Sequence, residues 1–108
     1  MFVIVNKYIL AGRFEGIVLW PFIFVRNKSL KKDLLFMNHE RIHIRQQLEL
    51  LIVFFFILYF FEYFYRLIRY RNSYTAYSKL SFEREAYANE RNADYLKNRK
   101  FWAFTQYF

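Results

Sequence analysis

The feature that most constrains the fold is a long apolar run in the middle of the chain. Residues 48–68 contain only three charged side chains, Glu49, Glu62 and Arg66, and the stretch 50–61 has twelve residues without any charge. Twelve residues are too few to cross a bilayer core, which needs ~20. As one helix, the whole run would measure about 31 Å, and Glu62 could pair with Arg66 one turn later. We therefore expect an apolar, membrane-associated helix over about 48–68; the alternative is a core helix wrapped by a small protein.

Composition supports a membrane setting. The chain of 108 residues has room for one domain, 1–108, and it is 56% apolar and 25% aromatic with two glycines and one proline. A net charge of +8 suits anionic lipid head groups, and it would also suit nucleic acid. Without cysteine, a metal site must use histidine and carboxylate. No removable signal peptide is expected, because no basic segment precedes the first apolar residues.

Both histidines of the chain lie just before the apolar run. His39 and His43 are four residues apart, and Glu40 directly follows the first. On a helix, capped by Asp33 or Asn38, the two imidazoles share one face, while Glu40 lies about 100° further round. This pattern predicts a metal site with a base beside it. The alternative is a polar helix face with the glutamate paired to an arginine.

The N-terminal part has the composition of extended structure. Residues 2–5 and 16–25 are β-branched and aromatic, and the turn-prone residues 11–13 separate them. We expect a strand pair. Because proline cannot donate a hydrogen bond to a neighbouring strand, Pro21 places the second strand at a sheet edge, where it can pair with an extended peptide. A short membrane-dipping hairpin is the alternative.

A second helix is expected from Ser81, as its N-cap, to Leu96. Helical spacing puts Glu85 on a stripe with small and apolar residues, and it puts Glu83 and Glu90 on the far side. A carboxylate that points inward needs a metal ion or a basic partner. Glu85 is therefore the candidate third ligand; pairing with Arg45 or Arg66 is the alternative.

His39-Glu40-x-x-His43, followed 42 residues after His43 by Glu85-Ala86-Tyr87-Ala88-Asn89, resembles the gluzincin metallopeptidases. The membrane-bound HtpX-like and antibiotic-sensor families are the most similar in style. The strand with Pro21 is similar in position to their substrate-binding edge strand. Asn89 stands where those families usually carry aspartate, so the partner of the ligands differs, since an amide accepts a hydrogen bond without charge.

The resemblance implies a minimal zincin-like domain of the α+β class, in which His39, His43 and Glu85 hold Zn²⁺ and Glu40 is the catalytic base. It implies hydrolysis of a peptide bond by a water that the metal activates. The resemblance does not identify the residue that would donate a hydrogen bond to the oxyanion. The candidates are Tyr87, Tyr95 and an arginine.

The expected function is a membrane-associated zinc metalloendopeptidase, located in a bacterial inner membrane with undecided orientation. Its expected partners are a peptide or protein substrate and lipid, with a homo-oligomer or a partner protein completing the cleft of so short a chain. A non-enzymatic, basic, aromatic-rich membrane protein with an accidental motif is the competing hypothesis. Nucleic acid is not an expected partner, because alternating arginine and tyrosine over 66–77 would leave the apolar run without a role.

Overall fold

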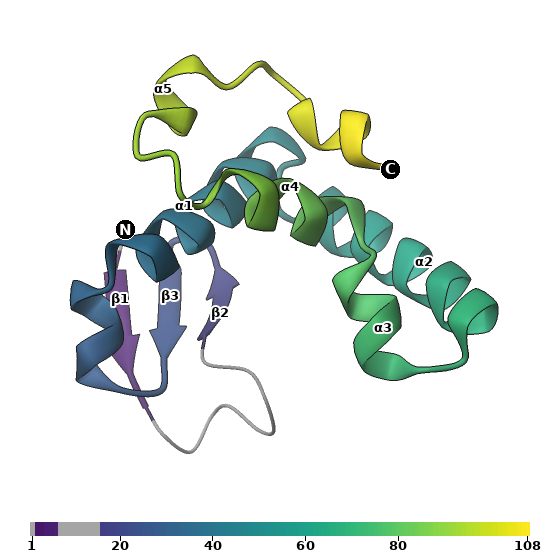
Figure 1. The fold of residues 1–108 in the computed structure, drawn as a ribbon, viewed down its shortest axis with the longest axis horizontal. Coiled ribbons are helices and arrows are strands. Elements are labelled where there is room, and N and C mark those ends of the chain that lie inside the picture. The colour runs from purple at the N-terminus through teal and green to yellow at the C-terminus, as the bar shows by residue number, and fades with distance from the viewer. Residues whose placement is uncertain (1, 7–15) are drawn as a thin grey trace.

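The computed structural model describes residues 2–6 and 16–108 and shows a small α+β fold (Figure 1), as expected. Its sheet has three strands, β1 (Phe2–Val5), β2 (Gly16–Leu19) and β3 (Phe22–Val25). β3 lies in the middle, parallel to β1 and antiparallel to β2. The turn predicted at 11–13 lies outside the described residues.

The strand predicted over 16–25 is two strands. A tight connection at Trp20 and Pro21, joined by a cis peptide bond, reverses the chain between β2 and β3. Pro21 thus lies in the turn and removes no hydrogen bond from the ladder. β2 is nevertheless an edge strand, whereas β3 in the middle buries Ile23 and Val25 completely.

Helix α1 (Leu34–Glu49) packs against the sheet and carries both histidines. It follows a short 3₁₀ helix (Lys28–Lys32). Asp33 precedes its first residue, and the Asp33 side chain accepts a hydrogen bond from the Phe36 amide. Asp33 is therefore the cap, one of the two expected. Buried side chains from the sheet and the helix form the first hydrophobic cluster. It contains Val18, Ile23, Val25, Leu30 and Met37.

The apolar run does not continue α1 as one helix. Helix α2 (Val53–Tyr70) leaves α1 at an angle of 110°, and the chain reverses through Leu51 and Ile52, both with positive φ. The Val53 amide donates to the carbonyl of Leu51 at 2.6 Å, which closes a tight γ-turn. Within the described residues no single helix has the length and apolarity to cross a membrane; α1 and α2 meet that criterion only as a bent pair. The helix predicted over 48–68 is therefore confirmed for residues 53–68, whereas residues 48–52 belong to the end of α1 and to the bend, so the helix with the histidines does not continue into it.

Four helices follow α2; the first packs against α2, the second against α1, and the last against the second. They are α3 (Ser73–Ser78), α4 (Ser81–Asn89), α5 (Tyr95–Asn98) and a final 3₁₀ helix (Ala103–Tyr107). The helix predicted over 81–96 ends early, so α4 and α5 are separate. Phe82 of α4 contacts Phe55 and Phe104 at ring-centroid distances of 4.7 Å each, and these residues form a second hydrophobic cluster. In Figure 1, α4 crosses α1 between the sheet on one side and the α2–α3 pair on the other.

A buried carboxylate on α2 fixes the start of α4. Glu62 accepts hydrogen bonds from the amide of Ser81, at 2.8 Å, and from its hydroxyl, at 2.6 Å. Glu62 also pairs with Arg66 at 3.5 Å, as the sequence predicts. Ser81 is the first residue of α4 and not its N-cap; the free amide at this helix end is satisfied by a side chain from another helix.

Candidate metal centre

Three side chains converge between α1 and α4. The Nε2 atoms of His39 and His43 lie 3.2 Å apart. Glu83 of α4 lies against both: one carboxylate oxygen is 3.4 Å from Nε2 of His39, and the other is 3.1 Å from Nε2 of His43. All three residues are buried, and they are the one group of this kind that could hold a metal ion among the described residues.

The outer nitrogens of both imidazoles are hydrogen-bonded to acceptors. Nδ1 of His39 lies 2.6 Å from the carboxylate of Glu90, and Nδ1 of His43 lies 2.8 Å from Oε1 of Gln46. The amide of Gln46 has one possible orientation, because its Nε2 donates to the Phe82 carbonyl and to Glu85. Both Nδ1 atoms therefore carry hydrogen, so in the neutral imidazoles both Nε2 atoms present lone pairs to Glu83.

Three electron-pair donors this close together need a positive charge between them, from a proton or from a metal ion. Burial disfavours the imidazolium form of His43, yet the charge of Glu83 and its hydrogen bond raise the pKa of His43 to about 9. For Glu83, burial is outweighed by His43 and His39, and its pKa falls well below the usual range. Zn²⁺ also fits: ligands at ~2.0–2.1 Å in a tetrahedron are roughly 3.3 Å apart, close to the separations observed.

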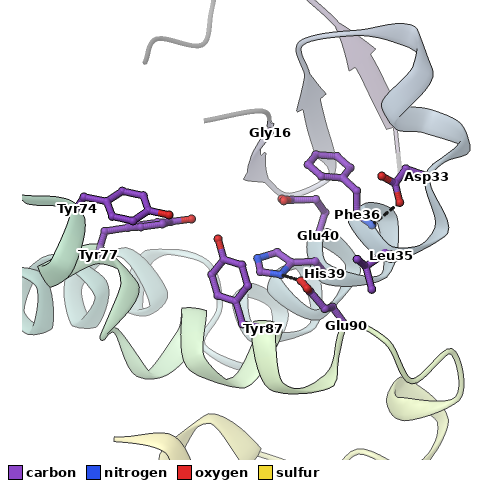
Figure 2. Close-up of a pocket in the computed structure, with 10 residues that line it drawn as sticks. All are labelled: Gly16, Asp33, Leu35, Phe36, His39, Glu40, Tyr74, Tyr77, Tyr87 and Glu90. Atoms are coloured by element: carbon purple, nitrogen blue, oxygen red, sulfur yellow. Dashed lines mark hydrogen bonds and ion pairs between the residues drawn. The ribbon is translucent and has the colours of Figure 1, made fainter. Parts of the chain in front are cut away.

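Glu40 lies beside this group and lines a cleft of about 260 Å³. Figure 2 shows its carboxylate pointing into the cleft next to His39, facing the hydroxyl groups of Tyr77 and Tyr87 across it. Burial raises the pKa of Glu40; His43 and His39 oppose that shift, and the charges of nearby acidic groups add to it. A carboxylate with a raised pKa is a stronger base than an exposed one.

Two tyrosines reach the centre from α3 and α4. The hydroxyl of Tyr77 donates to Glu83 at 3.0 Å. The ring of Tyr87 packs edge-on against His39 at a centroid distance of 4.5 Å. Tyr87 is half exposed, so its hydroxyl is available to a molecule in the cleft. Tyr95, the other tyrosine considered from the sequence, bonds Glu85 instead.

Glu85, the predicted third ligand, lies elsewhere. It is completely buried and accepts hydrogen bonds from Gln46 at 2.9 Å, Tyr95 at 2.7 Å and the guanidinium of Arg99. Its basic partner is Arg99, which also donates to Glu49 at 2.6 Å, and not Arg45 or Arg66. Glu85 therefore acts on the histidines only through Gln46.

Asn89 also differs from its expected role. Its amide donates to the Glu85 carbonyl and to the hydroxyl of Tyr107. The carboxylate that bonds an imidazole belongs to Glu90, the next residue.

Glu83 faces the histidines, and Glu85 does not, because α4 is covered on two sides. The stripe with Phe82 and Glu85 faces α2 and the C-terminal segment, whereas Glu83, Tyr87 and Glu90 face the histidines. A carboxylate and tyrosine stripe looks solvent-facing in sequence. The signal that was available is spacing, because these three residues recur at intervals of four and three, which also define one helical face.

The edge strand β2 is attached to α1 one turn after His43. Gln47 donates to the Val18 carbonyl at 2.8 Å and accepts from the Trp20 amide at 2.8 Å, so its amide makes the two hydrogen bonds that a neighbouring strand would make. In a strand, every second residue presents its backbone groups to the same edge. Gly16, two residues before Val18, therefore presents its N–H and C=O along this edge, and it lines the cleft with Glu40.

Comparison of the chain with protein-family models, with curated proteins and with solved structures found no match.

We predict that Glu85 makes folding stability depend on acid pH. Burial alone would raise its pKa, but the hydrogen bonds of Arg99, Gln46 and Tyr95 hold the pKa of Glu85 below the usual 4.5. The stabilisation is therefore complete above pH 4.5 and is lost as pH falls through the lowered pKa. Glu85→Gln should lower the free energy of unfolding at pH 7 by about 3 kcal/mol, and this deficit should shrink in acid.

The measurement is urea unfolding of both proteins between pH 7 and pH 3. Asp94→Asn is the control, because the Asp94 side chain pairs with Lys97 at 3.6 Å on an exposed surface, and it should have no measurable effect. A deficit for Glu85→Gln that is the same at every pH would contradict the prediction.

Proposed function

We propose that the chain is a zinc-dependent peptide hydrolase in which His39, His43 and Glu83 hold the metal and Glu40 is the general base. The observation that carries the proposal is the convergence of two imidazole lone pairs and a carboxylate beside an open cleft. A bound zinc ion would polarise a substrate carbonyl and lower the pKa of a water molecule. Glu83 replaces Glu85 in the ligand set that the resemblance implies.

Other residues of the chain would transfer the proton, stabilise the oxyanion and orient the imidazoles. Glu40 takes a proton from the attacking water and delivers it to the leaving amine, which its raised pKa favours. Tyr87 points its hydroxyl into the cleft and donates to the developing oxyanion. Glu90 and Gln46 hold the two imidazoles in the tautomer that leaves Nε2 free.

An extended peptide is the substrate that best suits the cleft. The edge of β2 presents backbone donors and acceptors beside Glu40, and such an edge binds a peptide backbone whatever its side chains are. Gln47 occupies the far end of this edge and leaves Gly16 for a bound strand. These contacts favour a peptide over a small molecule.

Metal content tests the ligand set. The purified protein, dialysed against a weak chelator, should retain about one zinc per chain by elemental analysis. Glu83→Gln should lose it, because a carboxamide is a poor zinc ligand, whereas Glu85→Gln should retain it at pH 7. Loss with Glu85→Gln and retention with Glu83→Gln would restore the ligand set implied by the resemblance. A folded wild type without zinc would favour the non-enzymatic alternative.

Glu40→Gln separates chemistry from metal binding. This variant should keep its zinc, yet its hydrolysis of fluorescently labelled casein should fall at least about 100-fold, because the amide cannot accept the proton. Equal hydrolysis by wild type and Glu40→Gln would assign any observed activity to a contaminant or to another base.

Two neighbouring glutamines allow a matched test of metal positioning. Gln46→Leu removes the acceptor for Nδ1–H of His43 and should weaken zinc binding by about 10- to 100-fold. Gln47→Leu removes the same chemical group one residue later, but the Gln47 amide bonds Val18 and Trp20 rather than an imidazole, so zinc affinity should stay close to that of the wild type. Competition with a chromophoric chelator measures both affinities; equal weakening would mean that general loosening of α1 is responsible.

A further inference from the structure

The outer face of α2 is apolar and exposed over most of its length. Six large side chains recur there at steps of one, three and four residues, which places them on one side of the helix. They are Phe54, Ile57, Leu58, Phe61, Phe64 and Ile68. We call them the outer stripe. Phe61 is 73% exposed and Ile68 is 79% exposed, so the stripe is not covered by the rest of the described chain.

The opposite face of α2 is fastened to the fold. Phe55 packs on Phe82, Glu62 holds the start of α4, and the guanidinium of Arg66 lies over the ring of Phe108 at 5.2 Å. Surrounding α2 with lipid on all sides would break these contacts and expose Glu62 and Arg66 to hydrocarbon. The outer stripe is therefore the one face of α2 that can meet an apolar phase while the fold stays intact.

Exposed arginines follow the outer stripe at its C-terminal end. They are Arg69, in the last turn of α2, and Arg71, directly after the helix. The acidic residue of α2, Glu62, is buried on the opposite face. A second copy of this chain, with net charge +8, would add its own positive charge to a dimer interface, whereas an anionic surface would neutralise these arginines.

We propose that the outer stripe lies flat in the interface of an anionic lipid bilayer, with Arg69 and Arg71 at its end contacting lipid phosphates. From residue 54 to residue 68 the stripe measures about 21 Å, less than the ~30 Å of a bilayer core, which fits an in-plane helix and not a spanning one. Apolar burial and electrostatic attraction then act together. This inference goes beyond the proposed hydrolase and does not depend on the metal.

Vesicle flotation tests the binding. The wild type should float with vesicles of phosphatidylcholine containing one third phosphatidylglycerol, and much less with phosphatidylcholine alone. Phe61→Glu and Ile68→Glu should each lower the bound fraction by about tenfold or more, since each puts a charge where an apolar side chain would be buried in lipid. Leu34→Glu is the matched control: Leu34 is 82% exposed but lies at the start of α1, and this variant should bind like the wild type.

Spin labels test the orientation, and the absence of native cysteine allows single labelling sites. Labels at Phe54→Cys, Phe61→Cys and Ile68→Cys should report the same shallow depth in vesicles if α2 lies in the plane. A graded depth along the three sites would overturn the in-plane placement.

Two further results would overturn the proposal. One is equal vesicle binding by the wild type and Phe61→Glu. The other is a dimer in solution that Phe61→Glu dissociates, without vesicle binding by either protein. His43→Ala should bind vesicles normally, so a failure of the metal proposal is distinguishable from a failure of this one.

Discussion

The face of α1 that meets α4 is polar, and the need to satisfy it once buried governs the structure around it. Asn38 donates to the carbonyls of Glu90 and Asn92 beyond the end of α4. His39 follows directly, His43 comes one turn later, and then Gln46, each with a partner on or near α4. An unpaired polar group at such an interface would cost about 1–3 kcal/mol. The position of α4 along α1 is therefore set by these pairings more than by apolar packing.

The apolar material is divided between two clusters on either side of this interface. One joins the sheet to α1, and the other joins α2, α4 and the C-terminal segment. The bend after α1 makes this division possible, because it turns the apolar run away from the helix that carries the histidines. Arg99 joins the C-terminal segment to α4 through Glu85 and to α1 through Glu49. The candidate centre is thus supported by an ion-pair network that does not contact His39, His43 or Glu83 directly.

The errors of the sequence-based predictions have a common origin. Periodicity assigns one buried face to a helix, but α4 buries two, and the second face consists of carboxylates and a tyrosine that resemble a solvated surface. The sequence predicts Glu85 as a ligand because it lies among small apolar residues. Its charge is instead balanced by Arg99, fourteen residues later, and no local pattern links the two residues. The bend at Leu51 and Ile52 also has no signal in the sequence, since neither residue favours positive φ.

Local spacing alone places His39 and His43 on one helical face with Glu40 beside them, because four residues make about one turn. It also predicts the pairing of Glu62 with Arg66 and narrows the cap of α1 to Asp33 or Asn38, since both depend on neighbours within a few residues. Three features follow from the tertiary structure instead: the glutamate that faces the histidines, the face of α2 that stays exposed and the strand edge that borders the cleft. Those features depend on how the helices cross and on which distant side chain neutralises each buried charge. The pattern of residues along the chain specifies neither of these.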